Sequence, residues 1–189
     1  AIKWYTKAAE KGNADAQYAL GAYYMSGNGT ARDDAKAAAW FRKAAEQDRA
    51  RAQYLLGYPL SRGDGVARNN VESASWYRKA AEKGHADAQY AYGLALGTGT
   101  GVAKDDTESN VWLKKAAEQG QSDAAYLLGW NFETGVGALP DYAQAAQWYR
   151  KAADANNGAA LFQLAALHRD GRGVEKDEAK ALDLYKKAA

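Results

Sequence analysis

The chain has no cysteine, two prolines and two histidines in 189 residues. Without cysteine it forms no disulfide and no thiolate metal site. No apolar run reaches the ~18 residues that a membrane span needs, so we expect no membrane insertion. The 25 basic and 23 acidic residues give a formal net charge of +2. This near balance indicates neither nucleic acid nor an acidic membrane surface as a partner.

Residues for catalysis or metal binding are also scarce. No serine stands in a GxSxG turn, the pattern that exposes a nucleophilic serine. His85 and His168 have no second histidine four residues away to complete a metal pair. A GxG segment follows each A helix, but none continues to GxxG after a predicted strand, as a phosphate loop requires. We therefore predict no catalytic residue, no metal and no cofactor, and we do not expect an enzyme.

Tryptophan, by contrast, recurs at a fixed interval of 36 residues, with Leu184 at the last step and no insertion between. Self-similarity at such a period is typical of a stacked repeat array. Arrays of this kind usually present an extended binding surface. We call these indoles the tryptophan ladder and expect them to pack in the core: Trp4, Trp40, Trp76, Trp112 and Trp148.

Each repeat predicts two helices. The first, the A helix, covers about 14–26 in the first full repeat, and Gly27 follows it where a left-handed residue ends many helices. The second, the B helix, runs to about Glu46 after Asp33, whose side chain can accept from the free amides of the first turn. The same phases hold these residues in later repeats: Gly63, Gly99, Gly135 and Gly171 at the A-helix end, and Asn69, Asp105, Asp141 and Asp177 before the B helix.

Further small residues recur at fixed phases. A second glycine follows each A-helix end: Gly29, Gly65, Gly101, Gly137 and Gly173. The turn between repeats holds glycine, aspartate or asparagine, the residues that best tolerate positive φ: Gly12, Asp48, Gly84, Gly120 and Asn156. Glycine inside a helix costs ~1 kcal/mol, so its recurrence at one A-helix phase predicts close helix packing: Gly21, Gly57, Gly93 and Gly129, with Ala165 last.

The segment WYRKAAEKGHADAQYAYG at 76–93 closely resembles the Sel1-like repeat, a relative of the tetratricopeptide repeat. The resemblance covers the whole chain. It implies an all-α fold, a right-handed α/α superhelix (solenoid) of about five helix–turn–helix repeats, with the A helices lining the concave side. We expect one array with a half repeat at 1–11 and repeats at 12–47, 48–83, 84–119, 120–155 and 156–189. Because the chain opens inside a repeat, we expect a piece of a longer protein.

The resemblance also implies a function, an adaptor or scaffold module that binds a protein or peptide in its concave groove. One alternative is a bacterial protein that binds carbohydrate or the cell envelope, with a glycan as partner. A weaker alternative is a hydrolase such as a β-lactamase, implied by cysteine-rich relatives whose cysteines are absent here. Some bacterial members are exported, which favours a periplasmic or secreted location.

Three rows of residues follow the A helices on the face opposite the small residues. The first row is mostly tyrosine: Tyr18, Tyr54, Tyr90, Tyr126 and Phe162. The second row, one turn later, varies between repeats: Ala22, Tyr58, Leu94, Trp130 and Ala166. The third row follows: Met25, Ser61, Gly97, Glu133 and Arg169.

Variation along the second row suits recognition better than shared packing. Trp130 is the one tryptophan outside the 36-residue register, and groove aromatics are typical interface hot spots. We therefore predict that Tyr58, Leu94, Trp130 and Glu133 form the centre of a partner site. The flanking residues are Tyr18, Tyr54, Tyr90, Tyr126 and Arg169. Two alternatives stay open: the first row packs against the B helix of its own repeat, and the second row adds repeat packing.

Two further predictions concern charge and proline. Two neighbouring basic rows on the B helices, one beginning with Lys7 and Lys43 and the other with Arg42 and Arg78, precede acidic residues by three and four positions. This is ion-pairing spacing, so we expect a solvated, self-neutralised face. Pro59 lies inside a predicted A helix, where it lacks an amide donor and clashes one turn back. We expect a kink or an early stop near Tyr58.

Overall fold

The computed structural model describes residues 2–189, and its elements in that range are helices alone, eleven of them. The B helices are α1 (Ile2–Glu10), α3 (Asp34–Glu46), α5 (Asn70–Glu82), α7 (Asp106–Glu118), α9 (Tyr142–Asp154) and α11 (Glu178–Ala188). The A helices are α2 (Ala14–Ser26), α4 (Ala50–Arg62), α6 (Ala86–Thr98), α8 (Ser122–Thr134) and α10 (Gly158–Asp170). Within the described residues, no helix is both long and apolar enough to cross a membrane.

Side-chain caps begin the B helices as the sequence predicts. The Asp33 carboxylate accepts from the Lys36 amide at 2.9 Å, and the same bond recurs at the start of α5, α7, α9 and α11. Each cap satisfies one of the amides that a helix start leaves without a partner. The turn residues also adopt the predicted left-handed backbone, including the two that are not glycine, Asp48 (φ 72°) and Asn156 (φ 59°).

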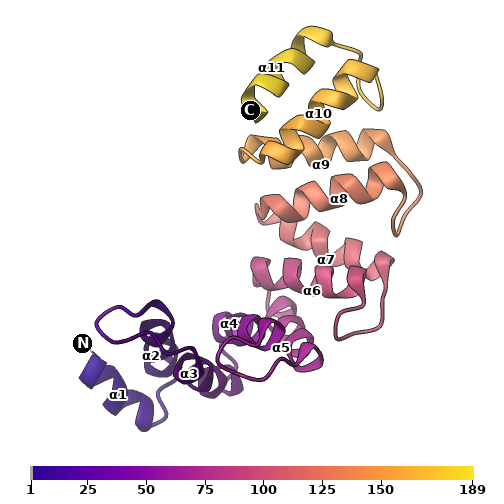
Figure 1. The fold of residues 1–189 in the computed structure, drawn as a ribbon. Coiled ribbons are helices and arrows are strands. Elements are labelled where there is room, and N and C mark those ends of the chain that lie inside the picture. Colours follow the sequence, from indigo (N-terminus) through magenta and orange to yellow (C-terminus); the bar gives the residue numbers. More distant parts are fainter. Residues whose placement is uncertain (1) are drawn as a thin grey trace. The chain divides into compact units, whose positions relative to one another are not determined.

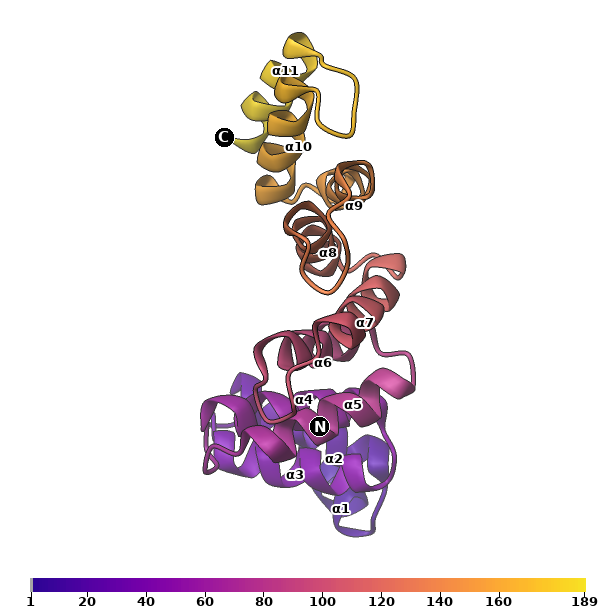
Figure 2. The ribbon, with the colours of Figure 1, turned by 90° about the vertical axis from the view of Figure 1, so that its right-hand side faces the viewer.

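Contacts divide the chain into two compact units, each a run of antiparallel helices (Figures 1 and 2). The first unit holds the described residues up to Ala91 and Thr100–Ala103, and α1 to α5 pack in sequence order within it. The second holds Tyr92–Gly99 and Lys104–Ala189, where α7 to α11 pack in the same way. The α6 helix contributes its first residues to one unit and its last residues to the other.

Glycine lets the A and B helices approach closely, as predicted. A β-carbon added to Gly57 would lie 2.4 Å from Cε1 of Tyr77, inside any van der Waals contact. In the first unit the resulting core is mainly alanine and leucine around Phe41, which is 1% exposed. Small side chains therefore fill much of this core, because the helix backbones lie close to one another.

The α4 helix continues through Pro59 to Arg62, so the predicted early stop near Tyr58 is wrong. The residues after the proline are held in place. Leu60 is 2% exposed in the core, and the Pro59 carbonyl accepts from the Gly63 amide at 2.7 Å. Packing on both sides of the proline therefore outweighs the missing hydrogen bond.

The tryptophan ladder is packed to very different degrees. Trp112 is 9% exposed, Trp40, Trp76 and Trp148 are half-buried, and Trp4 is 76% exposed. The prediction that all five are core residues is therefore wrong for Trp4. A register position fixes which face of a helix a residue occupies, but burial needs a neighbouring element over that face.

Candidate functional site

The first row of the A helices packs against B helices. Ring centroids of Tyr18 and Phe41 lie 6.1 Å apart, and those of Tyr54 and Tyr77 lie 5.9 Å apart. The second unit repeats this contact in the pairs Tyr126–Tyr149 (5.9 Å) and Phe162–Tyr185 (5.0 Å). Except for Phe162, which is 55% exposed, the first-row side chains are half-buried. These contacts favour the packing alternative for the first row.

The second row presents two large side chains to solvent. Tyr58 is 47% exposed on α4, and Trp130 is 41% exposed on α8. The guanidinium of Arg62 lies 5.3 Å from the Tyr58 ring centroid, at cation–π distance. Leu94, on α6, is half-buried. Tyr58 belongs to the first unit and the other two to the second, so each unit's part of the row is described by itself.

Third-row residues are engaged by other parts of the protein. Glu133 accepts from the Tyr149 hydroxyl at 2.8 Å and from Arg172 at 3.3 Å, and its side chain is 17% exposed. Arg169 forms an ion pair with the adjacent Asp170 at 2.7 Å. Both charges are therefore satisfied within the second unit. At the other end of the row, Met25 is 40% exposed.

The structure adds a hollow of ≈ 60 Å³ in the first unit that the sequence does not show. It lies where α2, α3 and α4 meet, and its walls are mainly apolar: Met25, Ala37, Ala38, Phe41, Leu55, Tyr58 and Pro59. Three charged residues complete the lining: Arg32, Asp34 and Asp64. The hollow thus joins Tyr58 of the second row to Met25 of the third. The one signal of it in the sequence is the proline.

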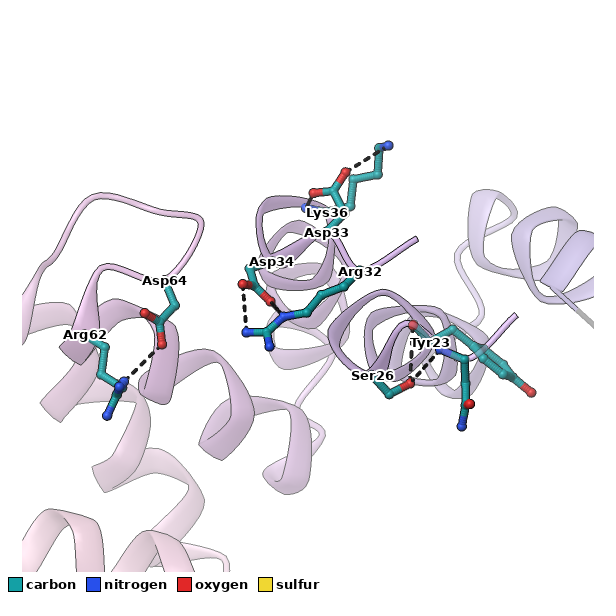
Figure 3. Close-up of polar contacts among 9 residues, drawn as sticks. Tyr23, Ser26, Arg32, Asp33, Asp34, Lys36, Arg62 and Asp64 are labelled. Atoms are coloured by element: carbon teal, nitrogen blue, oxygen red, sulfur yellow. Dashed lines mark hydrogen bonds and ion pairs between the residues drawn. The ribbon is translucent and has the colours of Figure 1, made fainter. Parts of the chain in front are cut away.

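Figure 3 shows two ion pairs, Arg32–Asp34 and Arg62–Asp64, to which the hollow's three charged lining residues belong. Arg32 donates to Asp34 through Nε at 2.9 Å and through Nη2 at 3.0 Å. The Arg62 guanidinium donates to Asp64 at 3.1 Å. The pKa of Arg32 is raised, first by its hydrogen bond with Asp34 and then by the charges of Asp34 and Asp64. The rim therefore carries equal numbers of positive and negative charges, already paired.

The lysine row stands over the tryptophan ladder. In each B helix that carries a ladder indole, a lysine three residues later lies over the ring, at 4.0 Å for Lys115 and Trp112 and at 4.2 Å for Lys79 and Trp76. Among the described residues, no ion pair joins this lysine row to the acidic residues three positions on. The basic row one position earlier forms the predicted pairs, as in Arg78–Glu82 at 2.8 Å and Lys114–Glu118 at 4.0 Å. Cation–π contacts cover one face of these indoles, which leaves less of each ring for a ligand.

The histidines occupy structural positions. The His85 ring stacks on Tyr54 with centroids 5.0 Å apart, and its Nδ1 accepts from the Ala88 amide at 3.4 Å. Burial lowers the pKa of His85, and the charge of Arg51 lowers it further against the opposing effect of Asp87. His168 is 5% exposed, with Nδ1 3.2 Å from the Glu175 carbonyl. In residues 2–189, no group of three histidine or acidic side chains is placed to hold a metal ion.

The model of the Sel1 repeat matches residues 1–13, 14–48, 50–85, 86–121, 122–157 and 158–189. The chain belongs to the Sel1 repeat family. The family model starts each full Sel1 repeat two residues later than the boundaries predicted above. It therefore assigns the A helix and the following B helix to one Sel1 repeat, as the predicted boundaries do.

Solved structures of other Sel1 proteins are similar to this array. A protective antigen of uropathogenic Escherichia coli strains, c5321, is 36% identical with a TM-score of 0.96, over 99% of this chain and 40% of that protein. A Sel1 repeat protein from Oxalobacter formigenes is 35% identical with a TM-score of 0.89, over 94% of this chain and 73% of that one. The chain thus spans less than half of the E. coli antigen.

A more distant likeness concerns the Sel1 fold alone. The immunity protein Pa5087 from Pseudomonas aeruginosa is 23% identical with a TM-score of 0.58, over 99% of this chain and 73% of that one. No curated protein matches the Sel1 array by sequence.

Proposed function

We propose that this Sel1 array is a protein- or peptide-binding module, in an adaptor or scaffold role, that uses the exposed face of its A helices without catalysing a reaction. One observation carries the proposal: the large aromatics of the variable second row, Tyr58 and Trp130, are 47% and 41% exposed. The aromatics of the regular first row instead contact B-helix rings. Aromatic side chains that packing does not use are the usual anchors of protein interfaces.

The proposed site keeps the predicted residues and gives them different roles. Tyr58 is the anchor in the first unit and Trp130 the anchor in the second, and Leu94 stands at the same register position in α6. Glu133 and Arg169 act as neighbours that shape the second unit's surface, because their charges are already paired there. The half-buried first-row residues support this exposed face of the A helices: Tyr18, Tyr54, Tyr90 and Tyr126.

The alternative of glycan binding finds less support. Sugars stack on open indole faces, and the ladder indoles carry a lysine ammonium over one face at 4.0 to 5.5 Å. Trp130, outside the ladder, is the indole that a glycan would use. If chitooligosaccharides or peptidoglycan fragments quench its fluorescence while no peptide binds, the glycan alternative replaces this proposal.

A selection from a random peptide library, displayed on phage against the full 189-residue chain, tests the proposal. Selected peptides are then titrated against variants by calorimetry. We expect Tyr58→Ala or Trp130→Ala to weaken each peptide at least ~10-fold, the lower range of a hot-spot effect. Matched controls are Val71→Ala and Val111→Ala, which remove 68% and 49% exposed side chains from the B helices α5 and α7. Equal effects in all four variants would contradict the proposal.

A further inference from the structure

Pro59 is an exceptional residue inside a helix of normal length. The same phase in the other A helices holds Tyr23, Ala95, Asn131 and Leu167. Proline in a helix interior costs ~3 kcal/mol, because it removes one hydrogen bond and clashes with the preceding turn. Yet α4 keeps the 13 residues that its neighbours have. Proline therefore destabilises α4 at a position where the other A helices form without it.

The missing amide has a specific consequence for Leu55. In an α-helix the carbonyl of one residue accepts from the amide four residues later, and residue 59 has no amide hydrogen. The Leu55 carbonyl oxygen therefore lacks its partner in the helix. A helix carbonyl points towards the helix C-terminus, so this oxygen faces residue 59, and residues 55, 58 and 59 share one face of α4. All three of these residues line the hollow of the first unit.

The hollow and this oxygen together define an occupant. Its ≈ 60 Å³ is several times the ~10–15 Å³ that one water needs and well below the ~150 Å³ of a cavity that accepts benzene. A short aliphatic side chain fits that range, and the apolar walls favour it. At the rim, Arg32–Asp34 and Arg62–Asp64 are neutralised already, so a charged group would find no free counter-ion. The carbonyl oxygen of Leu55 carries a partial negative charge and lacks its helical donor, so an N–H group of a partner would complement it.

We propose that the hollow between α2, α3 and α4 takes one aliphatic side chain of a partner peptide, of valine to leucine size. The backbone N–H of that residue, or of its neighbour, donates to the Leu55 carbonyl. This inference rests on the proposed function and names what the partner presents to the first unit. Met25 and Tyr58, 40% and 47% exposed, close over the bound side chain. Pro59 acts by keeping the acceptor free.

Titration with small amides tests the inference without knowledge of the natural partner. The probe is N-acetyl-leucine methylamide, added to the full chain labelled with ¹⁵N and with ¹³C at its single methionine methyl group. Comparison probes are the analogues with both amide nitrogens methylated and with lysine or aspartate in place of leucine. We expect saturable shifts at the Met25 methyl and the amides of 55–60. The lysine and aspartate probes should bind at least ~10-fold more weakly, since they lose apolar burial.

Pro59→Ala supplies the decisive comparison. It restores an amide at position 59 that takes up the Leu55 carbonyl. Because it also shortens one wall side chain of the hollow, the methylated and unmethylated probes are compared within the variant. Methylation of the leucine probe should weaken binding to the natural chain ~3- to 10-fold, the value of one hydrogen bond, and should change little in Pro59→Ala. Pro140→Ala, in a loop outside the hollow, is the matched control and should keep the natural response.

Each outcome decides between the two proposals. If the leucine probe binds and methylation matters equally in the natural chain and in Pro59→Ala, the carbonyl is not the acceptor and the inference is wrong. It is also wrong if no probe shifts Met25 or 55–60, or if the lysine or aspartate probe binds best. Peptides that still depend on Tyr58 or Trp130 would then leave the proposed function standing. If the leucine probe binds but the selected peptides bind Tyr58→Ala and Trp130→Ala as tightly as the natural chain, the proposed function is wrong instead.

Discussion

The Tyr149 hydroxyl donates a 2.8 Å hydrogen bond to Oε2 of Glu133 and so joins α9 to α8 within the second unit. Arg172 donates to the other carboxylate oxygen, Oε1, at 3.3 Å. Burial raises the pKa of Tyr149, and the Glu133 carboxylate raises it further, so the phenol remains a donor well into the alkaline range. A residue predicted from the sequence to contact a partner is thus committed to the fold.

Tyr149→Phe should therefore destabilise the second unit. Phe keeps the buried ring and removes the donor to a carboxylate that is 17% exposed. Loss of a hydrogen bond to a charged group costs ~1.5–3 kcal/mol. Urea unfolding followed by circular dichroism measures this loss, and Tyr142→Phe, at a 37% exposed ring, is the control. Equal midpoints for the two variants would show that the Glu133 contact contributes nothing.

Pro59→Ala should raise stability. The restored hydrogen bond and the lost clash are worth ~3 kcal/mol, and the greater freedom of the unfolded chain takes back ~0.4–1 kcal/mol. Pro140→Ala has the second effect without the first, so its denaturation midpoint should fall slightly. Thermal melts of the two variants give opposite signs under this account. A lower midpoint for Pro59→Ala would mean that the proline is a structural requirement of α4.

The second loop glycines should differ from one another when they are replaced. Gly29 and Gly101 have nearly equal φ, +73° and +77°, so alanine costs each the same ~1–2 kcal/mol of backbone strain. A β-carbon on Gly101 would also lie 2.0 Å from the Asn70 carbonyl oxygen, whereas on Gly29 it would lie 3.5 Å from the Ile2 side chain. Gly101→Ala should thus unfold at clearly lower urea than Gly29→Ala. Matching midpoints would contradict the close loop contact.

His85 should make stability depend on pH just below neutrality. Its folded pKa lies below the ordinary 6.5, so the unfolded chain binds the proton first as the pH falls. The stabilisation is complete above 6.5 and is lost progressively below it. His85→Asn keeps a capping side chain, as Asn13 and Asn157 show, and removes the titration. Midpoints between pH 7 and pH 5 should fall less in the variant, and parallel curves would refute this role.

Local chemistry explains why much of the fold could be predicted. Caps such as Asp33 and turn residues such as Asp48 depend on a few neighbouring amides and on φ preference, both readable from residue type. Trp4 could not be predicted, because its register position says nothing about which element covers it. The early stop predicted near Tyr58 does not occur, because tertiary packing around Leu60 outweighs local propensity.

The candidate site was only partly predictable for the same reason. The helical period identifies Tyr58 and Trp130 as exceptions to the repeat, and both are exposed. The sequence does not show that Glu133 reaches Tyr149 or that the lysines lie over indoles. Acidic residues and aromatic rings both stand at helical spacing from possible partners, and spacing alone does not decide which contact forms. The hollow joins residues of three helices, from Met25 to Asp64, and such a meeting depends on tertiary structure.

One spectrum tests the central claim, that partners bind the A-helix face through the aromatic outside the ladder. The six tryptophans give six indole N–H signals in a ¹⁵N correlation spectrum. Trp76 and Trp112 donate to Glu72 and Glu108 at 3.2 Å and serve as internal controls. Titration with a library-selected peptide that is sensitive to Trp130→Ala should shift the Trp130 signal and leave the ladder signals in place. Shifts of the ladder signals with an unmoved Trp130 signal would contradict the account.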